Sequence, residues 1–83
     1  MEVNPNGAED KIVELKSWSD FWKRNFDRET LHLKLYLSKE WVEKFGEEDA
    51  AMAANRAYHA YSEMKRVNMK ISDLEELLKM MGS

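Results

Sequence analysis

Residues 30–45 read TLHLKLYLSKEWVEKF, and the hydrophobic period changes within this stretch. From position 31 to position 37, leucines alternate with polar or amphipathic residues, which is typical of a strand with one apolar face. Further on, the apolar side chains of Trp41, Val42 and Phe45 recur at helical spacing. We therefore expect a strand over residues 31–37 that leads into a short helix.

A single helix from Asp27 to Phe45 is the rival interpretation, because leucine and lysine are good helix formers. On a helical wheel, however, the leucines of residues 31–37 spread over more than half of the circumference, whereas on a strand they align. We therefore favour the strand. The helix that follows it should begin after Ser38, a good N-cap residue, and end at Gly46.

A short helix with an aromatic face is predicted upstream, over residues 17–26. The aromatic residues are Trp18, Phe21, Trp22 and Phe26. They recur at helical spacing, and Ser17 with Asp20 approximates a capping box at the start of this segment. Residues 11–15 (KIVEL) are too few for their periodicity to be informative, so they are either a second strand or the lead-in to this helix.

A longer helix is predicted to follow Gly46, from Glu47 to about Arg66, because acidic residues open it and basic residues close it. Its apolar stripe is built of small residues: Ala50, Ala53, Ala54, Ala57, Ala60, Tyr61 and Met64. Small side chains allow another element to approach closely. Val67–Ile71 reads as a connector, and Ser72 caps a last helix. The apolar face of that last helix consists of Leu74, Leu77, Leu78 and Met81.

Together these elements predict an α+β protein that is mostly helical. It would have three to four short helices and one or two short strands, around residues 31–37 and, if that segment is extended, 11–15. We expect residues 1–10 to be a disordered tail, because they are polar and rich in turn formers, and residues 11–83 to form a single small globular domain. The expected core comprises Trp18, Phe21, Trp22, Trp41, Phe45, Tyr61 and the C-terminal leucines.

Composition restricts the classes of protein that need to be considered. The chain has 83 residues, a formal charge of −3 and no cysteine, so disulfides are excluded and stability must come from tight helix packing or from oligomerisation. No apolar run approaches the roughly 20 residues that a membrane span needs, and the first residues do not resemble a signal peptide. We therefore expect a cytoplasmic protein with no membrane partner.

Catalytic and metal-binding patterns find little support, and we predict that the protein is not an enzyme. His59 and Glu63 share a helix face, but two ligands do not make a zinc site. The serines are explained as helix caps, and the glycines never cluster into a phosphate-binding loop. No cofactor, metal or small-molecule substrate is inferred.

A nucleic-acid-binding regulator is the alternative hypothesis. The polar face of the proposed strand (Thr30–Leu37) would show His32, Lys34 and Tyr36, and basic residues near the aromatic helix would assist it: Lys23, Arg24 and Arg28. Strand, helix, helix is the order of elements in ribbon-helix-helix repressors, which this segment resembles only in that order. The helix after the strand is shorter here than in that fold.

The favoured hypothesis is a non-catalytic adaptor or regulator that acts through protein contacts. A methionine- and leucine-rich helix face at the end of the chain suits a protein partner or a second copy of the same chain in a homodimer. The residues that we expect to make this contact are Leu74, Leu77, Leu78 and Met81. The same face could instead fold back within one chain, and the sequence leaves that alternative open.

Overall fold

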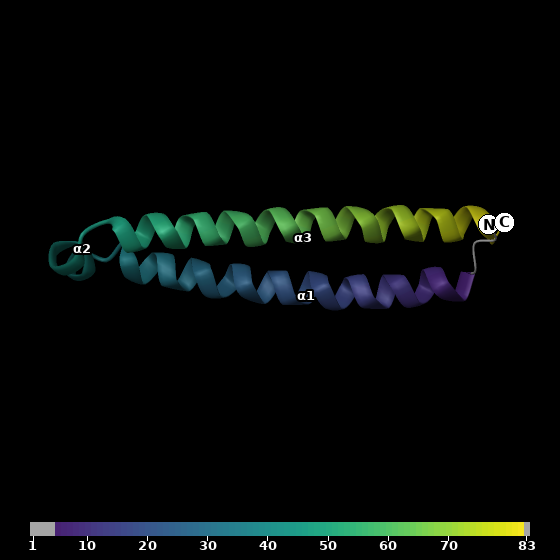
Figure 1. Ribbon diagram of the computed structural model, residues 1–83, viewed down its shortest axis with the longest axis horizontal. Coiled ribbons are helices and arrows are strands. Elements are labelled where there is room, and N and C mark those ends of the chain that lie inside the picture. Colours follow the sequence, from purple (N-terminus) through teal and green to yellow (C-terminus); the bar gives the residue numbers. More distant parts are fainter. Residues whose placement is uncertain (1–4, 83) are drawn as a thin grey trace.

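The fold is a long helical hairpin. The computed structural model describes residues 5–82 and contains, over that range, three helices: α1 (Pro5–Tyr36), α2 (Lys39–Phe45) and α3 (Glu48–Met81). Helices α1 and α3 run antiparallel side by side, and the short α2 lies at the turn between them (Figure 1). The hairpin measures 61 × 20 × 14 Å, so it is a single layer of two helices.

The predicted α+β class is wrong, because no strand occurs in residues 5–82. Residues 31–36 are the last turns of α1, and 11–15 lie inside the same helix. A strand needs a neighbour to pair its backbone groups, whereas a helix pairs them internally, and the residue types of 31–36 include no β-branched side chain that would oppose helix formation. The leucine alternation therefore distributes side chains around a helix, and three of the four leucines are exposed: Leu31, Leu35 and Leu37.

The turn between the long helices follows the local rules that the sequence predicted. Ser38 is the N-cap of α2, and its side chain accepts a hydrogen bond from the Trp41 backbone N–H. At the other end, Gly46 adopts a φ of +84° and donates its backbone N–H to the carbonyl of Val42 at 2.8 Å. Both the capping role of Ser38 and the stop at Gly46 are confirmed.

Helix α3 begins at Glu48, within a residue of the predicted start, but it does not end near Arg66. The expected connector Val67–Ile71 and the expected cap Ser72 both lie in mid-helix. Val67 and Ile71 are buried against α1, and burial of that kind favours a continuous helix over a local break. Of the expected tail, residues 1–4 lie outside the described residues, and Pro5 onwards belongs to α1.

The hairpin core is a seam in which residues alternate at spacings of three and four. On α1 the seam consists of Ala8, Ile12, Leu15, Ser19, Trp22, Phe26, Glu29, Leu33 and Tyr36, all buried or half-buried. On α3 it consists of Ala50, Ala53, Ala57, Ala60, Met64, Val67, Ile71, Leu74 and Leu78, again buried or half-buried. A mean spacing of 3.5 residues is that of a coiled coil, so α1 and α3 form an antiparallel two-helix coiled coil.

The two halves of the seam are packed differently. Next to the turn, α3 contributes only alanines, which leave room for the large side chains of α1 such as Trp22 and Phe26. Next to the termini, Ile12 and Leu15 pack with Val67 and Ile71 in a branched aliphatic cluster. Several large residues expected in the core are instead exposed: Trp18, Phe21, Phe45 and Tyr61.

Candidate protein-interaction surface

A second stripe of residues lies beside the seam on each long helix. On α1 it comprises Glu14, Trp18, Phe21, Asn25, Arg28, His32 and Leu35, and on α3 it comprises Met52, Arg56, His59, Glu63, Arg66, Lys70, Asp73, Leu77 and Met80. Each stripe keeps the spacing of three and four, so it follows the seam along the hairpin. Contacts between Trp22 and His59, and between Glu29 and Arg56, lie on the side where the stripes meet. We call the two stripes together the aromatic face.

A row of rings crosses the hairpin on the aromatic face. The ring centroids of Trp18 and Phe21 are 5.5 Å apart, those of Phe21 and Trp22 are 5.1 Å apart, and all pack edge to face. Trp22 continues the row across the seam to His59, at 5.5 Å. Edge-to-face packing holds each ring in one orientation. Trp18 and Phe21 nevertheless remain 48% and 42% exposed, so their outer surfaces face solvent.

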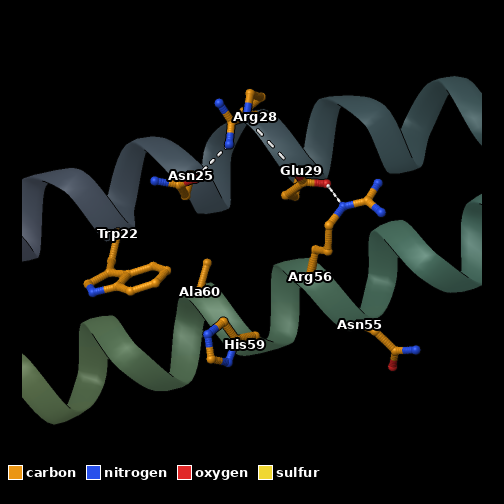
Figure 2. Close-up of a pocket in the computed structure, with 8 residues that line it drawn as sticks. All are labelled: Trp22, Asn25, Arg28, Glu29, Asn55, Arg56, His59 and Ala60. Atoms are coloured by element: carbon orange, nitrogen blue, oxygen red, sulfur yellow. Dashed lines mark hydrogen bonds and ion pairs between the residues drawn. The ribbon is translucent and has the colours of Figure 1, made fainter.

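An open groove of about 320 Å³ continues from this row toward the turn. Figure 2 shows its lining residues, which come from both long helices: Trp22, Asn25, Arg28, Glu29, Asn55, Arg56, His59 and Ala60. The aromatic rings of Trp22 and His59 form one end, and charged groups form the other end. The small side chain of Ala60 helps to keep the groove open between them.

The charged end of the groove is organised around Glu29, which occupies a seam position and is only 7% exposed. Its Oε2 accepts a hydrogen bond from the Arg56 Nε at 2.8 Å. Arg28 Nε lies 3.8 Å from Oε1, and His32 Nδ1 lies 3.7 Å from Oε2. The hydrogen bond from Arg56 lowers the pKa of the Glu29 carboxyl despite the opposing effect of burial, and the positive charge of Arg56, with smaller contributions from His32 and Arg28, acts in the same direction.

Sequence reasoning missed both Glu29 and Arg56. The signal that locates Glu29 is its place in the coiled-coil repeat, three residues after Phe26 and four before Leu33. That repeat becomes visible only when residues 27–36 are read as helix, and the strand interpretation concealed it. A single buried charge in such a seam is the device that coiled coils use to fix register and partner orientation.

The four residues expected to contact a partner do not lie together on one surface. Leu74 and Leu78 pack in the seam against the aliphatic cluster of Ile12 and its neighbours. Leu77 belongs to the aromatic face and is 38% exposed, and Met81 is also exposed, at the end of α3. Leu74 and Leu78, two of the four residues, are therefore covered within one chain, which is the alternative that the sequence left open.

The residues of the alternative hypothesis are spread around α1, because the strand that would have aligned them does not exist. Tyr36 packs on Trp41 with ring centroids 4.9 Å apart, and His32 faces Glu29. Arg28 lines the groove, while the remaining basic residues are exposed on other sides of the helix: Lys23, Arg24 and Lys34. Residues 5–82 therefore contain no strand on which these residues could form a nucleic-acid surface.

Comparisons with known proteins return no family model, no curated protein and no solved structure that matches this chain. Within residues 5–82, no helix is long and apolar enough to cross a membrane. Over the same residues, no group of three or more histidine or acidic side chains is placed to hold a metal ion.

Proposed function

We propose that this protein is a non-catalytic interaction module, a stiff helical hairpin whose aromatic face packs against another helical surface. A two-helix hairpin has one seam, and that seam covers only one side of each helix. The observation that carries the proposal is that large apolar side chains continue beyond the seam onto the aromatic face. They are Trp18, Phe21, Leu35, Met52, Leu77 and Met80, all of them exposed.

Exposed apolar residues at isolated positions are common in soluble proteins and carry no meaning of their own. Here, however, Trp18 and Phe21 are in mutual contact, and Phe21 in turn contacts Trp22, which lines the groove. Covering such rings removes apolar area from water at about 25 cal/mol per Å². Aromatic residues and arginine are also the types most enriched at the energetic centre of protein interfaces.

The chemistry of the groove favours binding over catalysis. Glu29 would have to serve as the general base, but a lowered pKa makes its carboxylate a weak one. Its Oε2 is already engaged by Arg56. The groove is open to solvent, whereas catalysis by a single carboxylate profits from exclusion of water.

The proposal requires that Trp18 and Phe21 contribute little to the hairpin itself. We expect the double variant Trp18→Ala/Phe21→Ala to retain its helical circular dichroism and to lose about 1 kcal/mol or less of unfolding free energy under dilute conditions. The matched control is Trp22→Ala, which removes an indole from the seam and should cost about 3 kcal/mol. A double variant that is destabilised as much as the control would show that the exposed rings serve the fold, and the proposal would fail.

A further inference from the structure

We infer that the partner of the aromatic face is a second copy of this chain, packed antiparallel to the first as a two-fold symmetric four-helix bundle. The inference rests on the proposed function and adds to it the identity and orientation of the partner. The two-fold axis would cross α1 at Phe21 and α3 between Glu63 and Arg66. In this arrangement α1 packs on α1 of the second copy, and α3 packs on α3.

The area of the face is sufficient for a stable dimer. The broad side of the hairpin spans 61 × 20 Å, and both long helices contribute to it (Figure 1). A standard interface buries roughly 800 Å² on each partner, which is less than this side offers. The face also has the composition of an interface, since aromatic rings lie at its centre and charged residues flank them.

When two copies pack antiparallel with the two-fold axis at Phe21, the α1 stripe of one copy matches the α1 stripe of the other. Reversal places Phe21 opposite Phe21 of the second copy, and Trp18, three residues from the axis, level with Arg24 and next to the uncharged Asn25. It also places Glu14 opposite Arg28 of the second copy, because both lie seven residues from the axis. Two-fold symmetry forms this pair of opposite charges twice in each dimer.

The α3 stripes of the two copies also match when they run antiparallel and the axis lies midway between Glu63 and Arg66. Each of these two residues would face the other in the second copy. Farther out, Arg56 would face Asp73 and the apolar Met52 would face Leu77, each pair lying at equal distances from the midpoint. The reversed stripe thus matches opposite charges at the Glu63–Arg66 and Arg56–Asp73 positions and apolar residues at the Met52–Leu77 position, while His59 faces Lys70.

The centre of the α1 pairing and the centre of the α3 pairing lie at nearly the same level of the hairpin. Two contacts across the seam fix this level: Ser19 Oγ donates to Asn68 Oδ1 at 2.6 Å, and the Phe26 and Tyr61 rings are 6.0 Å apart. Interpolation between them places Phe21 beside Arg66, one to two residues from the midpoint of Glu63 and Arg66. One axis perpendicular to the helices therefore serves both stripes, which is the condition that a closed dimer imposes.

A parallel dimer, with both turns at the same end, does not share this complementarity. In that dimer α1 of one copy would pack on α3 of the other, and residues at the same distance from the turn would face each other. Arg28 would then approach Arg56, and Glu14 would approach Asp73, so like charges would meet at both positions. Like charges placed opposite each other discriminate against a pairing, and the antiparallel arrangement avoids them.

Charge exchange at positions 14 and 28 tests the pairing. In the antiparallel dimer Glu14→Arg or Arg28→Glu alone would place like charges opposite each other twice, so each should raise the dimer dissociation constant about tenfold or more. The combined variant Glu14→Arg/Arg28→Glu restores opposite charges and should return the constant to within about threefold of wild type. Asp20→Arg makes the same change of charge as Glu14→Arg on an exposed site outside the aromatic face and should have little effect. Sedimentation equilibrium measures all four.

Spin labelling tests the orientation independently of these variants. The chain has no cysteine, so Lys44→Cys provides a single labelling site in α2 at the turn. In the antiparallel dimer the labels lie at opposite ends, and dipolar spectroscopy should give a distance on the scale of the 61 Å length of the hairpin. A short distance between the labels would overturn the inference.

Failure of this inference is distinguishable from failure of the proposed function. A chain that stays monomeric at all concentrations, or a dimer whose combined variant is not rescued, overturns the self-pairing. The unfolding measurement on Trp18→Ala/Phe21→Ala is unaffected by either result, because it asks only whether the exposed rings serve the hairpin. The proposed function therefore stands or falls on that measurement alone.

Discussion

Arg56 on α3 donates through its Nε to the Oε2 of Glu29 on α1 at 2.8 Å, and this bond crosses the seam in its alanine-rich half. The two partners differ in their surroundings. The Glu29 side chain is 9% exposed, whereas that of Arg56 is 45% exposed and could return to water if the pair were broken. The consequences of removing one partner should therefore depend on which partner is removed.

Removing Arg56 should cost more than removing Glu29. Arg56→Ala leaves a buried carboxylate without its main hydrogen-bond donor, and we expect the unfolding free energy to fall by about 2 kcal/mol. Glu29→Met replaces the carboxylate with an apolar side chain in the seam and releases Arg56 to solvent. It should leave stability unchanged or raise it by about 1 kcal/mol. Chemical denaturation measures both, and equal losses in the two variants would contradict this account.

Stability should fall in acid in a way that depends on Glu29. The folded state lowers the pKa of this carboxyl below its ordinary value of 4.5, mainly through the hydrogen bond from Arg56. The unfolded chain therefore binds the proton more readily, and the contribution of Glu29 is complete above pH 4.5 and is lost as pH falls through the folded pKa. Thermal midpoints measured from pH 6 downward should decline less steeply in Glu29→Gln than in wild type. The same slope in both chains would show that Glu29 is not responsible.

The alanine half of the seam should not tolerate larger residues. Ala53 has no exposed surface, so Ala53→Leu would force α1 and α3 apart or displace their side chains. We expect a loss of about 2 kcal/mol in unfolding free energy. Ala51→Leu, two residues earlier on the exposed side of α3, is the matched control and should change stability by less than about 0.5 kcal/mol. A similar effect at both positions would argue against close helix approach here.

The turn should require glycine at position 46. Gly46 has φ +84° and ψ −168°, a backbone region that is essentially restricted to glycine, although a Cβ there would meet no neighbouring atom. Gly46→Ala should therefore destabilise the hairpin by about 1–3 kcal/mol through backbone strain alone. Gly82→Ala, at a negative φ in the C-cap residue that follows α3, should be close to neutral. Comparison of the two thermal midpoints checks this, and a neutral Gly46→Ala would refute it.

The errors in the sequence prediction share one origin. Leu31, Leu33 and Leu35 alternate as a strand would, yet only Leu33 turns toward α3 and is half-buried. The strand interpretation assumed that all apolar residues must be buried together, but a hairpin with a single seam leaves several of them outside. The same assumption placed Trp18 and Phe21 in the core, whereas they lie on the exposed aromatic face.

The sequence by itself determined the features that depend on a few neighbouring residues. Ser38 caps α2 and Gly46 ends it, and α3 begins just after, because capping and backbone strain act within one turn. Only the tertiary structure decided that α1 is continuous to Tyr36, that α3 passes through Val67–Ile71 without a break, and that Glu29 lies buried beside Arg56. Those features depend on packing between residues far apart in the chain, such as Ser19 and Asn68, and no local pattern contains that information.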